Sequence, residues 1–203
     1  ETPTHAHQLA MQTPILFDRE LAQLRHVDSS VFKAHTVDIT WPIAEGPEGM
    51  ATALDRVCAQ ADDALADGTN ILILSDRAVS PERAAIPALL AVAGVHHHLV
   101  REGTRLQTGL VLESGEPREV HHFATLIGYG ASAINPYVMF ESLQKLVDEG
   151  LINGVEDFET AQDGLEYEAR MDAVLDRLEA VRKPTVALVD GFAMGSGFAI
   201  SAS

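Results

Sequence analysis

A repeat of strand and helix patterns is the feature of this sequence that most limits its fold. Between residues 35 and 148, short apolar or alternating segments are each followed by a segment with helical apolar spacing. One of them, Ile71-Leu72-Ile73-Leu74, is a continuous apolar run typical of a strand buried on both faces of a parallel sheet. The pattern predicts an α/β fold of parallel βα repeats, either an incomplete (βα)-barrel or a doubly wound sheet, and we favour the barrel. The predicted strands span residues 35–40, 70–76, 108–113 and 131–135, and the predicted helices span residues 50–66, 87–102, 117–127 and 137–148.

Two shorter patterns flank the first of these units. A helix is predicted to begin with Asp18 as its N-cap and to place Leu21 and Leu24 on one face. The segment Gly46-Pro47-Glu48-Gly49 predicts a turn before the helix at residues 50–66.

Composition excludes several classes of protein. A chain of 203 residues with 46% hydrophobic residues can bury a sizeable core and holds one domain, or one and a fraction. The formal charge of -16 argues against binding to nucleic acid or to anionic membrane surfaces. Cys58 is the only cysteine, so one chain forms no disulfide, no CxxC site and no cysteine-ligated cluster. No apolar run approaches the ~20 residues that cross a bilayer, and the start of the chain lacks the pattern of a signal peptide, so we expect a cytoplasmic protein.

The histidines raise the question of a metal site. His96-His97-His98 and His121-His122 fall in two predicted helices. Consecutive helical residues point about 100° apart, so neighbours do not all face one ion, and the pairs lack the i,i+4 spacing of a zinc-binding helix. We favour an interpretation in which one histidine of each group packs inward and the others cover the helix surface. A His-rich metal-binding module is the alternative.

Three carboxylates stand at predicted strand ends: Asp38, Asp76 and Glu113. In a (βα)-barrel the carboxyl ends of the strands form the active face, so these residues are candidates for catalysis. The competing interpretation is that Asp76 caps the next turn and Arg77 pairs with a carboxylate. We favour it, because the sequence places no nucleophile, metal set or phosphate loop nearby.

The sequence after residue 164 follows a separate pattern. Residues 165–181 predict an amphipathic helix that ends before Pro184, and residues 185–189 predict a strand. The segment Gly191-Phe192-Ala193-Met194-Gly195-Ser196-Gly197 then joins this strand to a predicted helix. Free backbone N–H groups at such a helix start suit an oxyanion hole. Tight packing of the helix on the strand explains the glycines equally well.

Long segments in a fixed order relate residues 1–155 to a known family. They are Asp38-Ile39-Thr40-Trp41-Pro42, Ala44-Glu45-Gly46, residues 70–77, Ile86-Pro87-Ala88-Leu89-Leu90-Ala91, residues 95–99 and 101–103, residues 113–119, His121-His122-Phe123 and residues 128–137. Together they resemble the central domain of the large chain of glutamate synthase.

This resemblance implies an enzyme that releases ammonia from glutamine, transfers it to 2-oxoglutarate and reduces the imine to glutamate with electrons passed through an iron–sulfur cluster and FMN. The amidotransferase cysteine, the cluster and the flavin barrel would lie elsewhere, since this chain starts at Glu1 and has one cysteine. The central domain is a connecting scaffold in that family. The resemblance therefore implies no catalytic residue and no cofactor here, partners in the remaining domains of the enzyme, and no activity in isolation.

Residues 164–203 carry a second resemblance. It rests on Leu175-Asp176-Arg177-Leu178-Glu179, on Lys183-Pro184-Thr185-Val186-Ala187 and on the glycine-rich loop, which is similar to that of the crotonase (enoyl-CoA hydratase/isomerase) superfamily. The family pattern has three consecutive glycines, and Ser196 stands here between Gly195 and Gly197. The resemblance implies that the Ser196 backbone N–H is an oxyanion donor for an acyl-CoA thioester. The glutamate of the hydratases falls at Ala199, so hydration is not expected.

These resemblances predict three parts: a glutamate synthase-like fragment at residues 1–155, a junction at 156–163 and a crotonase-like fragment at 164–203. The chain lacks an initiator Met and ends within an apolar stretch, so we expect a fragment, either of glutamate synthase or of an acyl-CoA-handling enzyme. An incomplete parallel sheet exposes edges and apolar faces, which predicts a tendency to self-associate.

Overall fold

The computed structural model describes residues 9, 11, 13–27 and 29–149 of the chain. The chain divides into two compact units, Glu1–Met139 and Phe140–Ser203. Helix α5 (Tyr137–Asp148) begins in the first unit, and its remainder is the helical part of the second unit that the structure describes. The predicted junction at 156–163 and the predicted crotonase-like segment at 164–203 lie outside the described residues.

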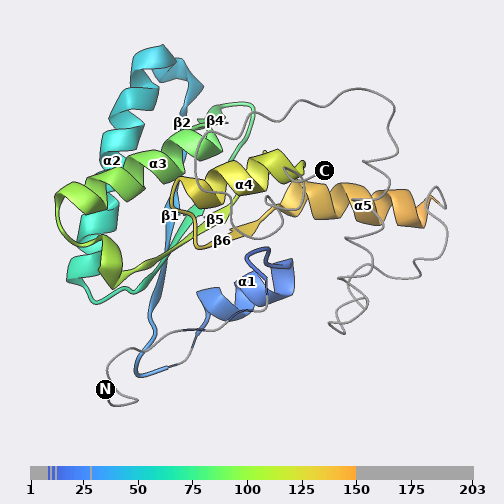
Figure 1. The fold of residues 1–203 in the computed structure, drawn as a ribbon. Helices are drawn as coiled ribbons and strands as arrows, with labels where there is room; N and C mark the ends of the chain where they lie inside the picture. The colour runs from blue at the N-terminus through green and yellow to red at the C-terminus, as the bar shows by residue number, and fades with distance from the viewer. Residues whose placement is uncertain (1–8, 10, 12, 28, 150–203) are drawn as a thin grey trace. The chain divides into compact units, whose positions relative to one another are not determined.

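A four-stranded parallel sheet forms the centre of the first unit (Figure 1). Its strands lie side by side in the order in which they occur in the sequence, and each pairs in parallel with the next. The prediction of an α/β fold with a parallel sheet is therefore confirmed. The strands are β1 (Ala34–Asp38), β3 (Ile71–Ser75), β5 (Gly109–Glu113) and β6 (Ala133–Asn135).

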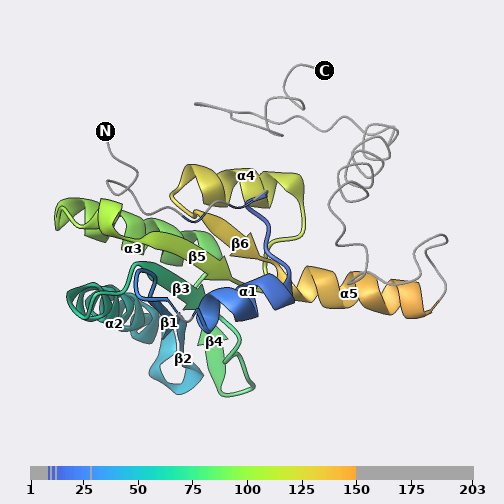
Figure 2. The same ribbon diagram turned by 90° about the horizontal axis from the view of Figure 1, so that it is seen from below.

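Helices cover both faces of this sheet, but in different ways. The helices that connect successive parallel strands pack on one face, where Leu72, Leu74, Leu110 and Leu112 are completely buried. Helix α1 packs on the opposite face through Leu21 and Leu24, against apolar residues of all four strands. Figure 2 shows α1 on one side of the strands and α2, α3 and α4 on the other. The helices are α1 (Asp18–Arg25), α2 (Gly46–Ala66), α3 (Ala88–Arg101) and α4 (Val120–Gly128).

An N-terminal segment extends the sheet beyond β6. The Leu16 N–H donates to the carbonyl of Ile134 at 2.8 Å, and the Ile134 N–H donates to the carbonyl of Pro14 at 2.7 Å. Ile15 thereby forms a parallel bridge to Ile134. The edge of β6 is thus paired with a segment that precedes α1 in the sequence.

A small antiparallel pair that the sequence did not reveal lies beyond the carboxyl ends of the parallel strands. It joins β2 (Thr40–Pro42) to β4 (Arg83–Ala85). A short 3-10 helix, η1 (Ile43–Glu45), follows β2 and leads into α2. A second one, η2 (Arg105–Gln107), precedes β5.

Local capping explains two differences from the predicted boundaries. The predicted turn that begins at Gly46 is the first turn of α2, since Pro47 fits a helix start where its missing N–H has no intrahelical acceptor. The N-cap of α1 is Phe17 rather than Asp18. The Glu20 carboxylate accepts the Phe17 N–H at 2.9 Å, which ties the helix start together.

Candidate functional site

Four polar side chains form a row across the carboxyl ends of the parallel strands. Asp38 pairs in register with Ser75, Ser75 with Glu113, and Glu113 with Asn135. Side chains alternate along a strand, and the preceding residues of the strands face α2, α3 and α4, so the row faces the α1 side of the sheet. Ser75, Glu113 and Asn135 are buried. Because a buried polar group is costly without a partner, the contacts of this row determine what it does.

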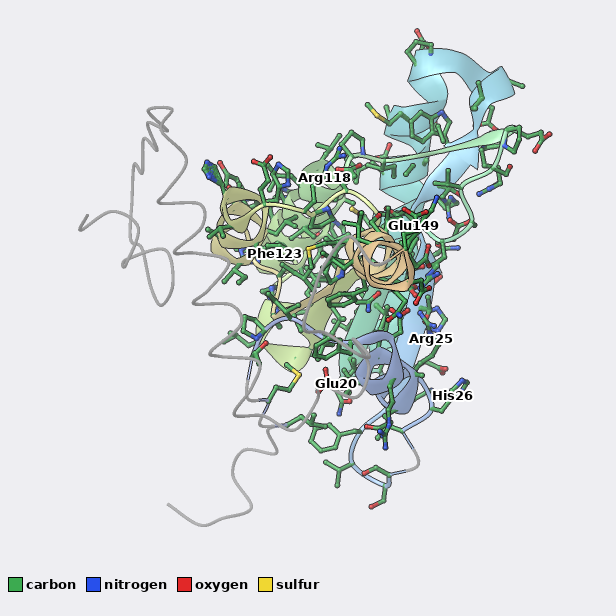
Figure 3. All side chains as sticks on the ribbon, turned by 90° about the vertical axis from the view of Figure 1, so that its right-hand side faces the viewer. Glu20, Arg25, His26, Arg118, Phe123 and Glu149 are labelled. Atoms are coloured by element: carbon green, nitrogen blue, oxygen red, sulfur yellow. The ribbon has the colours of Figure 1, made fainter. Side chains whose placement is uncertain are left out.

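Glu113 is held by two arginines and a hydroxyl. Its side chain is 4% exposed, and its Oε2 accepts from Arg25 Nη2 at 2.6 Å and from Ser75 Oγ at 2.5 Å. Its Oε1 accepts from Arg77 Nε at 3.2 Å. Figure 3 shows Arg25 at the C-terminal end of α1. The ion pair therefore fastens α1 to the middle of the sheet, in addition to the apolar contact of Leu21.

Asn135 and Asp18 make the second connection between the sheet and the N-terminal segment. Asn135 Nδ2 donates to Asp18 Oδ1 at 2.7 Å and to the Leu16 carbonyl at 3.0 Å. Asp18 Oδ2 accepts from Arg77 Nη2 at 3.4 Å. The two ends of α1 are thus both bound to residues at the carboxyl ends of the strands.

Asp76 follows β3 and organises the loop after β5. Its carboxylate accepts from Ser114 Oγ at 2.6 Å and from the Gly115 N–H at 3.0 Å. Burial, followed by a hydrogen bond to Asp76, raises the pKa of Tyr137 well above its usual range. The Arg77 guanidinium lies 3.8 Å from the centre of the Tyr137 ring. The Asp76 side chain therefore binds the loop after β5 and not, as predicted, the turn that follows β3, whereas the predicted pairing of Arg77 with a carboxylate is confirmed.

Asp38 connects β1 to the β2–β4 pair. Its Oδ2 accepts from Arg83 Nη2 at 2.8 Å, and its Oδ1 accepts from the Thr40 N–H and hydroxyl at 2.8 and 2.7 Å. Arg83 Nε donates to Thr40 Oγ1, and Arg56 Nη2 donates to the Thr40 carbonyl, both at 2.8 Å. The carboxylate therefore fixes where the antiparallel pair leaves the sheet.

A cavity of about 490 Å³ lies beside this row, between α1 and the strands. Its walls include Asp18, Leu21 and Arg25 of α1, and Thr36, Ser75 and Glu113 of the strands. Arg25 Nε is buried and has no acceptor among the described residues. The cavity thus combines an apolar wall with ionised groups, as small-molecule sites do.

The described residues contain few groups suited to nucleophilic or metal chemistry. In that part of the chain, no group of three or more His, Cys, Asp or Glu side chains is placed to hold a metal ion. Burial, together with the nearby Asp55 and Asp62 carboxylates, raises the pKa of the Cys58 thiol, which disfavours the thiolate. The carboxylates at the strand ends are bound to arginines, hydroxyls and backbone N–H groups. Their arrangement holds segments together and positions charge.

The predicted histidine groups are spread over three surroundings. His96 Nδ1 accepts from Arg105 Nε at 2.9 Å, and burial, followed by the charge of Arg105, lowers the pKa of His96. His98 Nε2 lies 2.7 Å from Asp62 Oδ2 on α2. His97 is exposed, as are His121 and His122 on α4. The first group therefore follows the favoured interpretation, with His96 packed inward as an acceptor, whereas neither member of the second group packs inward.

Arg25, Asn135 and Tyr137 belong to this site, although the sequence did not indicate them. A signal was present for Arg25, since Asp18, Leu21 and Arg25 stand at positions i, i+3 and i+7 of one helix face. Asn135 ends the fourth strand as Glu113 ends the third. The predicted oxyanion donor Ser196, with Gly195 and Gly197, lies outside the described residues.

The helices that the structure describes include none of the length and apolarity that crossing a membrane requires.

Comparison with known proteins relates the chain to glutamate synthases from several organisms. It is 43% identical over 146 residues to glutamate synthase [NADH] of Schizosaccharomyces pombe, which is 71% of this chain and 7% of the relative. It is 41% identical over 146 residues to the chloroplastic ferredoxin-dependent glutamate synthase of Spinacia oleracea, covering 70% of this chain and 9% of that protein. It is 36% identical over 149 residues to the glutamate synthase [NADPH] large chain of Bacillus subtilis, covering 73% of this chain and 10% of the relative.

The chain thus spans a tenth or less of the length of these relatives. The family model of the glutamate synthase central domain matches residues 1–181. This match continues through the predicted junction at 156–163 and ends before the Gly195-Ser196-Gly197 loop. No comparison supports the predicted crotonase resemblance of the tail. The chain belongs to the glutamate synthase central domain family.

Proposed function

We propose that this chain is a connecting scaffold within a glutamate synthase, which forms glutamate from glutamine and 2-oxoglutarate, and that it carries no active site of its own. The observation that supports this role best is the state of the carboxylates at the strand ends. Asp38, Asp76 and Glu113 occupy the places where a (βα)-barrel enzyme carries its catalytic groups. Each instead accepts hydrogen bonds that tie one segment of the fold to another.

The sheet itself is best interpreted as part of a (βα)-barrel. Its four strands lie in sequence order, and the helices that connect them share one face. A doubly wound sheet reverses its strand order and places connecting helices on both faces. Helix α1 covers the other face, but it precedes β1 and connects no two parallel strands. The polar row would then lie at the end of a barrel interior that α1 fills.

The cofactors of such an enzyme do not fit the described residues. An iron–sulfur cluster requires several cysteine thiolates, and this chain has Cys58 alone. An FMN phosphate is a dianion and favours a site with surplus positive charge. At the carboxyl ends of these strands Arg25 and Arg77 are balanced by Glu113 and Asp18, so no such surplus is present there. Both cofactors are therefore assigned to other parts of the enzyme.

The range of relatives also favours a scaffold. Their names specify NADH, NADPH or ferredoxin, yet this chain is 36–43% identical to representatives of all three kinds. A segment that bound the electron donor would be expected to differ among them. The electron donor of the enzyme containing this chain is therefore not assigned from this domain.

A chimera tests the scaffold role directly. The matched segment of the Bacillus subtilis large chain is replaced by residues 9–149 of this chain, and glutamine- and 2-oxoglutarate-dependent oxidation of NADPH is measured in the presence of the partners that enzyme needs. We expect measurable activity in the chimera, and neither activity nor flavin absorbance in this chain alone. Stoichiometric flavin in the purified chain would refute the proposal. A folded chimera that binds its flavin and is inactive would refute it as well.

A separate hypothesis concerns the tail, residues 164–203. The Gly195-Ser196-Gly197 loop, with Ser196 as an oxyanion donor to an acyl-CoA thioester, lies beyond the residues matched by the family model. The pattern in the sequence is its only support. Saturable binding of acetyl-CoA that a Gly197→Val substitution abolishes would support it, and no binding at millimolar acetyl-CoA would contradict it.

A further inference from the structure

We propose that the cavity between α1 and the carboxyl end of the sheet binds the carboxylate group of a small organic acid through Arg25 and Thr36. The inference is independent of the scaffold role, because it depends only on the cavity. At about 490 Å³, the cavity is of the size that small-molecule sites have.

The carboxylate oxygens on the cavity walls already have donors. Glu113 Oε2 accepts from Arg25 and Ser75, and Glu113 Oε1 accepts from Arg77. The two oxygens of Asp18 accept from Asn135 and Arg77. A cation or metal ion entering the cavity would have to displace these donors, so the walls are poorly suited to a positive ligand.

The hydrogen-bond donors on the cavity walls, in contrast, do not all have acceptors. Arg25 uses Nη2 for Glu113, whereas neither its Nε nor its Nη1 has an acceptor among residues that the structure describes. The Thr36 hydroxyl, exposed on β1, makes no hydrogen bond within the same part of the chain. The cavity therefore has more donors than acceptors, and it favours a ligand that brings acceptors.

Charge and shape narrow the ligand to a carboxylate. Arg25 and Arg77 balance Glu113 and Asp18, so the walls have no net charge of their own. The formal charge of -16 is spread over the whole chain, and salt screens charges beyond about 10 Å. Because Glu113 occupies Nη2 and Nε is buried, Arg25 leaves no parallel pair of N–H groups; its Nη1 and the Thr36 hydroxyl are the two donors that meet the two oxygens of a carboxylate. Leu21 supplies an apolar wall for the carbon chain of the acid.

Nuclear magnetic resonance of the full chain tests this proposal with sodium succinate as the probe. The signal of the Arg25 Nε–H reports on the guanidinium whose Nη1 makes the proposed contact, and sodium chloride at the same ionic strength controls for salt. We expect saturable movement of that signal with succinate and none with chloride. Equal movement in both salts would overturn the proposal, as would equally tight binding of sodium sulfate, since the site would then not be specific for a carboxylate.

Two variants and a control separate binding from folding. Arg25→Lys keeps the charge beside Glu113 but removes the planar N–H groups, and we expect succinate affinity to fall at least tenfold. Thr36→Val leaves every ion pair in place and is expected to weaken binding about tenfold or more, the effect of losing one hydrogen bond to a charged group. Arg118→Lys, at an exposed position before α4, should bind as the unmodified chain does. Unchanged affinity in both cavity variants, with melting temperatures confirming that they are folded, would exclude this site.

Discussion

Glu113→Gln is expected to lower the free energy of unfolding by about 2–3 kcal/mol. The substitution keeps the size of the side chain but removes its charge. Glu113 is 4% exposed and accepts from Arg25, Arg77 and Ser75. A glutamine has one carbonyl oxygen for these donors, and its NH₂ group meets an N–H or O–H donor in place of an acceptor.

The magnitude follows from burial. Removing one partner of a fully buried ion pair costs about 3–5 kcal/mol. The Arg25 and Arg77 side chains are 34% and 40% exposed, so water takes over part of the lost interaction and the expected loss falls below that range, to about 2–3 kcal/mol.

Urea unfolding followed by the fluorescence of Trp41 measures this loss, because Trp41 is the only tryptophan and lies in β2 of the same unit. Glu102→Gln, at an exposed position after α3, is the matched control and should change stability by less than about 0.5 kcal/mol. If Glu113→Gln costs no more than this control, then the ion pairs of Glu113 do not stabilise the fold.

Three further predictions concern other parts of the chain. Gly130→Ala should lower the free energy of unfolding by about 2–4 kcal/mol, because φ is +113° at Gly130 and the new Cβ would collide with the His96 ring. Gly68→Ala, at φ +82° in open space, is the control in the same urea assay and should lower it by about 1–2 kcal/mol. Burial and the neighbouring Arg105 lower the pKa of His96 in the folded chain. As the pH falls, His96 is therefore protonated in the unfolded chain before it is protonated in the folded one, and the free energy of unfolding should decrease from pH 7 to pH 5.5. His96→Asn, which keeps an acceptor for Arg105, should flatten that slope, and an unchanged slope would show that His96 is not its source. Limited proteolysis should cut first within residues 156–163, an acidic stretch of weak periodicity, and mass spectrometry of the earliest fragments would reveal a different first site.

The central sheet could be predicted because its strands carry a local signal. Ile71-Leu72-Ile73-Leu74 is apolar at every position, and only a strand covered on both faces buries such a run. The β2–β4 pair carries no such signal. Each of its strands has three residues, one contains Pro42, and Arg83-Ala84-Ala85 has neither β-branched nor aromatic side chains. What stabilises this pair is the contact of Arg83 with Asp38 and Thr40, which lie far from it in the sequence.

The candidate site was predictable only in part, for a similar reason. The carboxyl ends of parallel strands meet at one edge, so Asp76 and Glu113 could be placed there from the sequence. Their partners could not, because Arg25 binds Glu113 across 88 positions of the chain. A stripe on α1 shows that Arg25 and Leu21 share a face, but no local pattern tells which carboxylate the arginine meets.

The pairing of the N-terminal segment with β6 also governs when this sheet is completed during translation. Asn135 of β6 donates to the carbonyl of Leu16 across 119 positions, so the segment that covers the last edge of the sheet is made first, and the strand that it covers is made last. Closing a loop of that length costs about 4 kcal/mol of chain entropy. Residues 13–25 must therefore wait on the ribosome until β6 has emerged. A nascent chain stalled before Ala133 would expose Leu21 and Leu24 as a binding site for chaperones.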